Sequence, residues 1–202
     1  MLIFQENLPG NNSCFLYFRV IKFKNMIRAI LSLLLVICNL SCFAQTQEIP
    51  ASIKVPEDCS LIMHAYAKGV QVYICTQDPQ DTSRYVWTFL EPRANLYATA
   101  DNRKLIGKHY FNPAKKPTWE NTDGSTISGA KLQQTDSPDS LAIPWLLLKG
   151  ITASGTGKLT PVVFIQRINT KGGKAPATAD RQQKGQLLEQ PYTAEYLFYI
   201  KK

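Results

Sequence analysis

The chain has little of what sites for metals, nucleotides or nucleic acids require. Its 202 residues include two histidines and five cysteines, and none lie at zinc-site spacing, so we predict no metal and no cofactor. No long segment has the 3.6-residue hydrophobic period of a helix, which argues against helical and α/β folds. The formal net charge is +8, but most basic residues are spread singly, with pairs such as Lys115-Lys116 and Lys201-Lys202, instead of gathered on an aromatic-rich stripe. We therefore predict no nucleic-acid partner.

A phosphate-binding loop is also missing, although residues 150–159, GITASGTGKL, resemble one. Such a loop needs a glycine five positions before its Gly-Lys pair, a serine or threonine after that pair, and then a helix. Thr152 and Leu159 stand at the glycine and hydroxyl positions, and a β-branched run follows instead of a helix. We interpret the segment as a turn between two strands. The nearby Gly172-Gly173 pair likewise lacks the glycine pattern of a dinucleotide fold.

The first 44 residues have the features of a secretory signal peptide. Lys22, Lys24 and Arg28 precede an apolar run at residues 29–44, which is shorter than the roughly 20 residues that span a bilayer and ends in small residues. We therefore expect cleavage and export, leaving a mature chain at residues 45–202 that is secreted or periplasmic and has no transmembrane span. An N-terminal anchor that is never cut is the alternative.

Two further features of this N-terminal extension, residues 1–44, concern its start and its attachment. Signal peptides rarely carry a preamble as long as residues 1–25, and Met26 stands directly before the basic and apolar regions. We therefore predict that translation starts at Met26. A lipoprotein attached through Cys42 is a less favoured alternative, because lipoprotein signals usually place a leucine three residues before the cysteine, whereas Leu40 lies two before it.

Alternation of apolar and polar residues with period two dominates the rest of the chain. Roughly eight to ten short strands, separated by turn clusters, predict an all-β fold, a β-sandwich or a β-barrel, in a single domain over residues 45–202. The Asp123-Gly124 pair predicts a hairpin turn. Residues 143–148, IPWLLL, are either a strand buried on both faces or a helical turn. The clearest strand is the last, in which one face carries Tyr192, Ala194, Tyr196, Phe198 and Ile200.

Cys59 and Cys75 are the two cysteines outside the leader, and an even pair in an exported domain suggests a disulfide. We expect the residues between them to form two strands around a turn at Lys68-Gly69, which would bring both cysteines to the open end of one hairpin. The alternative is a pair of reduced, buried thiols.

The densest group of polar and aromatic residues, at positions 109–129, contains the candidate site. We predict that Trp119 stacks on a ring of a bound ligand, with His109, Asp123 and Arg167 as polar contacts. Such a patch suits a glycan or an envelope polymer. The favoured function is therefore a binding module of the cell envelope or extracellular space, without an assigned catalytic residue.

Two other functions use the same residues. A hydrolase would employ Glu120 or Asp123 with His109 as acid–base partner. A structural envelope protein would instead bury all three tryptophans in its core, with His109 capping a loop and Asp123 serving only as a turn residue.

Several unusual motifs follow one another along residues 60–200, among them GVQVYIC, DGSTISG, AIPWLLL, FIQRINTKGGKAP and PYTAEYLFY. Their order resembles that of domain-of-unknown-function family 3455. The resemblance implies a secreted or envelope-associated protein of bacteria or fungi with no established activity. Some members of the family carry a malate dehydrogenase label, which nothing in this sequence supports, since the nucleotide loop is missing.

Two departures from the family pattern affect the disulfide and the candidate site. The resemblance implies a cysteine soon after the GGKAP segment, able to pair with Cys75, but residues 177–183 read ATADRQQ. Either Cys59 substitutes as the partner or the bridge is lost. The short H-x-x-G-P-x-W motif of the family is stretched here to HYFNPAKKPTW at residues 109–119, so the mouth of a site at this place would differ.

Overall fold

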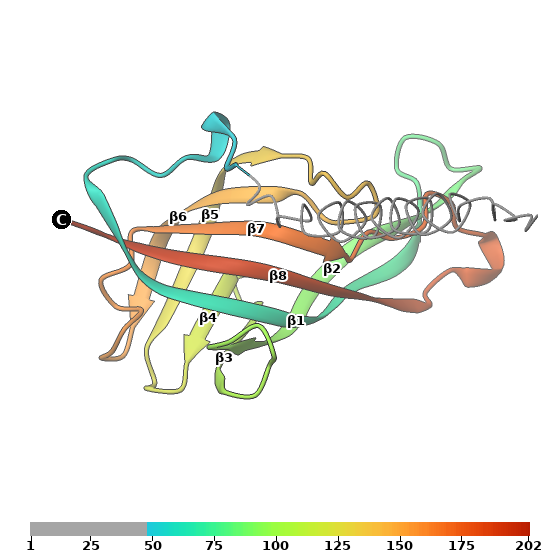
Figure 1. Ribbon diagram of the computed structural model, residues 1–202. Coiled ribbons are helices and arrows are strands. Elements are labelled where there is room, and N and C mark those ends of the chain that lie inside the picture. Colours follow the sequence, from blue (N-terminus) through green and yellow to red (C-terminus); the bar gives the residue numbers. More distant parts are fainter. Residues whose placement is uncertain (1–47) are drawn as a thin grey trace, which may run out of the picture. The chain divides into compact units, whose positions relative to one another are not determined.

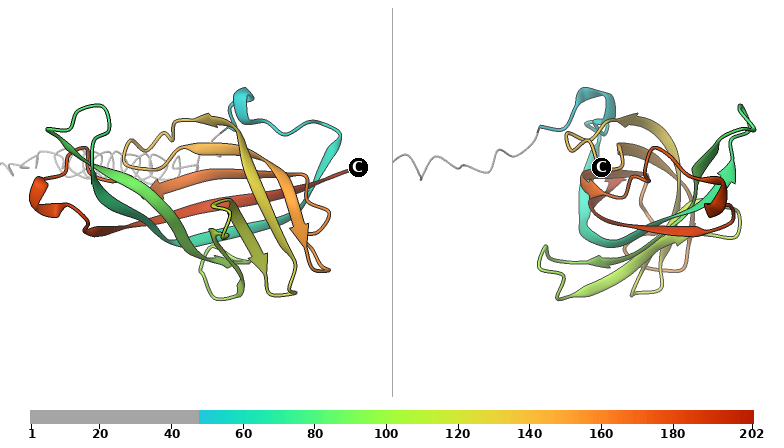
Figure 2. Two further views of the ribbon diagram at one scale, coloured as in Figure 1. Left: turned by 180° about the vertical axis from the view of Figure 1, so that it is seen from behind. Right: turned by 90° about the vertical axis from the view of Figure 1, so that its right-hand side faces the viewer.

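The computed structural model describes residues 48–202, which form eight antiparallel strands closed into a barrel (Figure 1). Each strand pairs with the next along the chain, β1 pairs with β8, and the ring of strands encloses the interior in the right-hand view of Figure 2. The predicted all-β fold is confirmed, and of its two forms the barrel is the correct one. The strands are β1 (Cys59–Gln77), β2 (Tyr85–Tyr97), β3 (Leu105–Phe111), β4 (Pro117–Asn121), β5 (Thr126–Thr135), β6 (Trp145–Ser154), β7 (Phe164–Gly172) and β8 (Leu187–Lys201), with 3₁₀ turns η1 (Ala51–Ile53) and η2 (Arg181–Gln183).

The predicted signal peptide, the start at Met26 and the attachment site at Cys42 all lie outside the described residues and stay predictions. The expected boundary of the mature chain at residue 45 also falls just before the first described residue. Within residues 48–202, no helix has the length and apolar character needed to cross a membrane.

The inward face of β8 follows the alternation expected from the sequence. Tyr192, Ala194, Tyr196 and Phe198 are all buried in one core cluster. Small residues lie beside the large ones, as where Ala65 of β1 pairs with Tyr196. Alternation of small and large inward side chains allows a narrow barrel to close around aromatic rings.

The predicted turn at Lys68-Gly69 is wrong, because β1 runs through it as one strand of 19 residues. Gly69 is needed there for a different reason. It pairs with Ala94 of β2, and a Cβ atom at position 69 would lie 2.1 Å from the main-chain oxygen of Arg93. The glycine therefore permits a close approach of two strands, not a change of direction.

The predicted disulfide between Cys59 and Cys75 is wrong for the same reason. The two cysteines lie near opposite ends of β1, and a strand rises about 3.3 Å per residue, whereas a disulfide needs Cα atoms within about 7 Å of each other. Both thiols are free. The Sγ atom of Cys75 lies 3.7 Å from the main-chain oxygen of Asp180, in the segment where the family resemblance implied a second cysteine. The bridge is therefore lost, and Cys59 does not replace the missing partner.

The apolar run IPWLLL leads into β6, whose first four residues, Trp145 to Leu148, are buried or half-buried on both faces. Leu148 belongs to the cluster inside the barrel, whereas Trp145 and Leu147 pack outside it against Ile53. The outer cover is the N-terminal segment that contains η1. It is held by a hydrogen bond of 2.6 Å that Nε2 of Gln166 donates to the main-chain oxygen of Ile53. Of the two predicted forms of this run, the doubly buried strand is correct.

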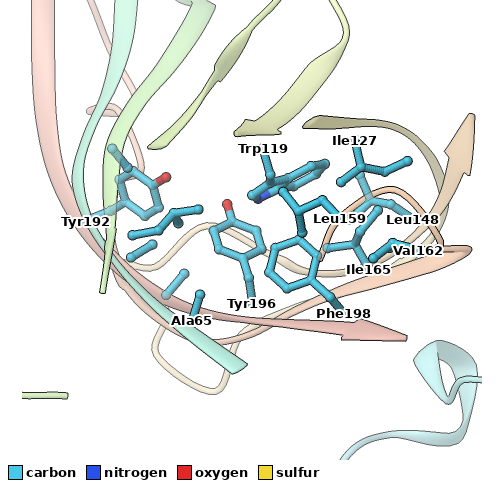
Figure 3. Close-up of a cluster of buried hydrophobic side chains, with 14 of the residues drawn as sticks. Ala65, Trp119, Ile127, Leu148, Leu159, Val162, Ile165, Tyr192, Tyr196 and Phe198 are labelled. Atoms are coloured by element: carbon cyan, nitrogen blue, oxygen red, sulfur yellow. The ribbon is translucent and has the colours of Figure 1, made fainter. Parts of the chain in front are cut away.

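One half of the barrel interior is filled by apolar side chains (Figure 3). The connection between β6 and β7 places Leu159 and Val162 in this half, where both are buried. Residues 150–154 belong to β6 and residues 155–159 lie in the connection to β7, so the interpretation of residues 150–159 as a turn between two strands is confirmed for its second half and wrong for its first. The other residues that fill this half are Ile127, Leu148, Ile165 and Phe198.

Candidate functional site

The other half of the barrel interior contains a cavity of about 450 Å³. Its wall is mostly apolar and aromatic with a few polar side chains, a composition typical of small-molecule sites. Three of the four ligand contacts predicted from the sequence line it together: His109, Trp119 and Arg167. These residues come from β3, β4 and β7, so barrel closure brings together side chains that are far apart in the sequence.

The cavity opens at a notch in the barrel wall between β2 and β5. The hairpin of β3 and β4 is short, and it pairs only with Ala94–Tyr97 of β2 and with Thr126–Ser128 of β5. The hydrogen-bonded wall therefore stops at the end of this hairpin, while β2 and β5 continue beyond it. Side chains from all of these strands line the cavity at the notch: Phe89, Pro92, Phe111, Pro117, Lys131 and Gln134.

His109 and Trp119 pair in register on β3 and β4 and stack on each other in the cavity wall. Their ring centroids are 4.5 Å apart with an interplanar angle of 11°, and the ring of Tyr196 lies 5.2 and 5.3 Å from them. Nδ1 of His109 donates a hydrogen bond of 2.9 Å to the main-chain oxygen of Thr118. Because a carbonyl can only accept, Nδ1 carries the proton, and Nε2 of the neutral ring is an acceptor.

Burial lowers the pKa of His109 to about 3; the hydrogen bond to Thr118 opposes this effect, and the positive charge of Arg167 adds to it. The imidazole is therefore neutral near pH 7. A histidine with so low a pKa is poorly matched to acid–base catalysis at that pH, which works best with a pKa close to the working pH. Its arrangement suits stacking and acceptance of a hydrogen bond.

Several buried polar atoms of the barrel interior make no hydrogen bond of regular geometry among the described residues. They are Nε2 of Gln71, Nε1 of Trp119, and the hydroxyl groups of Tyr192 and Tyr196. The Tyr192 hydroxyl lies close enough to Tyr196 and Gln71, and the Tyr196 hydroxyl close enough to Arg167, for the pKa of each tyrosine to respond to these neighbours, but the contacts are weaker than regular hydrogen bonds. In Figure 3 the Tyr196 hydroxyl and the Trp119 nitrogen lie on the side of the cluster nearer Tyr192, away from the filled half. A buried polar group without a partner costs about 1–3 kcal/mol. Such groups are expected where a ligand or water completes the hydrogen bonding.

Arg167 places a positive charge in the same cavity. It lies on β7 opposite Tyr196 of β8, and residues opposite each other on neighbouring strands project from the same face. Its Nε and Nη2 atoms donate hydrogen bonds of 3.1 and 2.8 Å to the main-chain oxygen of Pro144. In the Ile165-Gln166-Arg167 motif, Ile165 therefore packs in the filled half and Gln166 binds the N-terminal segment outside the barrel. Arg167 lines the cavity.

Residues 56–200 match the family model described as protein of unknown function (DUF3455). The chain belongs to the DUF3455 family. The resemblance drawn from the order of the motifs is thereby confirmed. The chain has no significant match among curated proteins or among solved structures.

In this DUF3455 protein, the stretched segment at residues 109–119 builds one side of the cavity. It begins with His109 and ends with Trp119, and its Phe111 and Pro117 reach the notch. Lys115 supports the β3–β4 turn in a left-handed conformation with φ of 57°. The departure from the family motif therefore lies at the mouth of the cavity.

Asp123, the fourth predicted ligand contact, lies in the β4–β5 turn and is not among the residues that line the cavity. Its carboxylate accepts hydrogen bonds of 2.9 Å from the main-chain N–H groups of Ser125 and Lys158, and a third from Oγ of Ser125. These bonds, led by the one from Lys158, hold the pKa of Asp123 well below its usual range. The carboxylate ties the turn to the loop that carries Leu159.

Glu120, the other carboxylate considered for hydrolysis, also lies away from the cavity lining. It accepts a hydrogen bond of 2.9 Å from the Tyr110 hydroxyl and forms a salt bridge of 3.2 Å with Lys108. Because side chains alternate along a strand, Glu120 projects away from the face of its neighbour Trp119. Among the described residues, no three His, Cys, Asp or Glu side chains gather where a metal ion could be held.

The sequence reasoning did not include Gln71 or the two tyrosine hydroxyls in the candidate site. Gln71 is buried and lines the cavity together with Tyr73 of the same strand, and their period-two spacing is the signal that could have placed it inward. Alternation in β8 predicts that Tyr192 and Tyr196 point inward. It cannot predict that their hydroxyls lack partners, since this depends on what lies across the barrel.

Proposed function

We propose that this protein binds a small ring-bearing ligand inside its barrel, such as a free sugar or the terminal unit of a glycan or envelope polymer. The observation behind the proposal is that one cavity combines an aromatic wall with unpaired polar atoms. Aromatic rings pack on planar and apolar ring faces, and the unpaired groups supply hydrogen bonds that orient a ligand. The cavity of about 450 Å³ falls in the usual range for small-molecule sites, about 300–1,000 Å³.

The burial of Trp119 limits the kind of ligand. Only 1% of its surface is exposed, so an extended polymer cannot lie across it as on an open platform. A chain end or a molecule of one or two sugar units can enter through the notch between β2 and β5. The polymer or glycan considered from the sequence is therefore narrowed to its terminal unit.

Binding is favoured over the two other functions by the placement of the polar groups. Asp123 and Glu120, the carboxylates that hydrolysis would need, are absent from the cavity lining. A purely structural protein would gain stability by filling the cavity, since each unpaired buried donor is costly. The leader-like pattern of the first 44 residues supports a location in the periplasm or outside the cell.

A thermal-shift screen of the full chain against sugars, short glycans and peptidoglycan fragments tests the proposal. A ligand at 100 times its Kd stabilises the folded state by about 2.7 kcal/mol, which a melting curve resolves. Trp119→Phe and Trp145→Phe form a matched pair of variants. Both indoles are 1% exposed and both Nε1 atoms lack a partner within the described chain, but only Trp119 lines the cavity.

We expect at least one ring-bearing compound to raise the Tm. Trp119→Phe should then weaken the binding of that compound by about tenfold, the value of one hydrogen bond, while Trp145→Phe binds like the wild type. A panel without any hit, or equal losses of affinity in the two variants, would contradict the proposal.

A further inference from the structure

The charged side chains that line the cavity are all of one sign. Arg167 and Lys131 are cations, and no aspartate or glutamate is among the described lining residues. His109 is neutral near pH 7 because its pKa is about 3. The empty part of the barrel is therefore a positively charged space, which favours an anionic ligand.

Within the described chain, Arg167 has no acidic partner, in contrast to Arg93 and Arg103. Arg93 and Arg103 form salt bridges with carboxylates on the outside of the barrel, whereas none of the salt bridges among residues 48–202 involves Arg167. Its partner is the neutral main-chain oxygen of Pro144. A buried or half-buried charge is normally paired, so Arg167 lacks the counter-ion that its position calls for.

The bonds to Pro144 come from Nε and Nη2 and use one edge of the planar Arg167 guanidinium. The Tyr196 hydroxyl also lies close enough to Arg167 for a weak hydrogen-bond interaction, which opposes the rise that burial causes in the pKa of Tyr196. The other edge of the guanidinium, made by Nη1 and the second N–H of Nη2, presents two parallel donors. This edge matches the two oxygens of a carboxylate, which arginine commonly binds in a bidentate manner.

The unpaired buried atoms of the cavity lining can donate hydrogen bonds, which a carboxylate accepts. Nε2 of Gln71 and Nε1 of Trp119 can only donate hydrogen bonds, and the hydroxyl of Tyr196 can donate as well. A carboxylate has about four lone-pair sites, more than one arginine edge occupies. The cavity thus contains additional donors for the lone pairs that Arg167 leaves free.

The charge of Arg167 acts on several groups of the cavity. Burial raises the pKa of Tyr196, and Arg167 acts against that rise. Burial lowers the pKa of His109, and Arg167 acts in the same direction. An anion placed beside Arg167 would therefore meet a positive potential that reaches the aromatic wall.

We propose that the ligand of this cavity carries a carboxylate, which binds to the edge of the Arg167 guanidinium that lies away from Pro144, while the ring of the ligand lies against the His109–Trp119–Tyr196 wall. This inference rests on the proposed binding function and narrows it to ring-bearing acids. Acidic sugars and aromatic acids share this chemistry, and the test separates them.

The test uses calorimetric titration of the full chain with two matched pairs of probes. Methyl glucuronide is compared with methyl glucoside, and benzoate with benzyl alcohol, because the members of each pair differ mainly in the carboxylate. In the responding pair, we expect the acid to bind at least about tenfold more tightly than its neutral partner. The pair that responds identifies the ligand as an acidic sugar or an aromatic acid.

Three variants locate the effect. Arg167→Met removes the charge but keeps an aliphatic side chain, and should weaken binding of the acid by about 10- to 100-fold while leaving the neutral probe nearly unchanged. Arg167→Lys keeps the charge without the planar fork and should give an intermediate loss, which also serves if the methionine variant does not fold. Arg93→Met, at an exposed arginine with its own carboxylate partners, should bind both probes like the wild type.

Two results would overturn the inference. One is equal affinity of the wild type for the acid and neutral members of both pairs, or no binding of either pair. The other is undiminished binding of the acid by both Arg167 variants. Binding of neutral ring compounds in either case, or a hit in the thermal-shift screen, would leave the proposed function standing without the carboxylate.

Discussion

The two halves of the barrel interior contain different kinds of side chain, although the same strands build both. On β8, Phe198 belongs to the filled half and Tyr196 lines the cavity, two residues apart. On β7, Ile165 and Arg167 show the same change over the same step. Three of the four unpaired polar atoms in the described part of the interior belong to residues that line the cavity, namely Gln71, Trp119 and Tyr196. A step of two residues on one strand face therefore separates a position that stabilises the fold from a position that can hold a ligand.

The comparison also shows how such a cavity can be maintained. Burial of a large apolar side chain contributes about 1.5–3 kcal/mol to stability, whereas a buried polar group without a partner costs about 1–3 kcal/mol. The filled half and the outer cluster under the N-terminal segment offset the cost of the cavity. Proteins commonly give up stability in this manner at functional sites.

The largest expected contrast is between Phe198→Ala and Tyr196→Phe. Phe198 is 0% exposed, and such a truncation in a packed region lowers the free energy of unfolding by about 3–5 kcal/mol. Tyr196→Phe removes a hydroxyl that makes no regular hydrogen bond and only weak contacts with Tyr192 and Arg167, so the free energy of unfolding should change by less than about 1 kcal/mol or increase. Urea unfolding of both variants measures the contrast. Equal losses would mean that the two halves are packed alike.

A smaller effect is expected in the pH dependence of stability. The pKa of His109 is about 3 in the folded protein and about 6.5 in an unfolded chain, so between these values only the unfolded chain binds the proton. The contribution of neutral His109 to the free energy of unfolding is therefore complete above pH 6.5. It decreases at lower pH, by about 1.4 kcal/mol per pH unit once the pH is well below 6.5.

His109→Phe keeps an aromatic ring at this position and removes the titration. Its free energy of unfolding, measured in urea at pH 7, 6 and 5, should depend less on pH than that of the wild type. Identical pH profiles of the variant and the wild type would contradict the burial of His109 as a neutral group in the cavity wall.

The smallest effect is expected for Asp123→Asn. This substitution removes a charge that holds the loop placing Leu159 in the filled half of the barrel. The carboxylate holds the loop that carries Leu159, and its folded pKa lies below the usual range. Its stabilisation is therefore present above the unfolded pKa of about 3.9 and lost as the pH falls below that value. The variant should have a lower Tm than the wild type at pH 7, and the difference should shrink below pH 4.

Asp139→Asn is the matched control for this prediction. The Asp139 carboxylate accepts a main-chain hydrogen bond of 2.9 Å from Leu141 within its own loop. Its substitution should lower the Tm less than that of Asp123. A larger loss in the control variant would contradict the assigned role of Asp123 in holding two loops together.

Much of the fold could be predicted because strand alternation is local. The inward face of β8, the hairpin turn at Asp123-Gly124 and the doubly buried run in β6 all follow from the order of neighbouring residues. The turn at Lys68-Gly69 was wrongly predicted since a glycine signals either a change of direction or a close approach of backbones. Only the partner strand, here at Arg93, distinguishes the two.

The residues of the candidate site could likewise be predicted from local sequence only in part. By itself the sequence determined an all-β chain without a nucleotide loop and marked His109, Trp119 and Arg167 as residues of interest, because composition and alternation are properties of short segments. Only the tertiary structure decided that these three meet in one cavity while Asp123 stays in a turn and the two cysteines stand apart. The physical reason is that strand pairing and barrel closure place distant segments side by side, and the side chains that lie opposite each other across the interior depend on that closure.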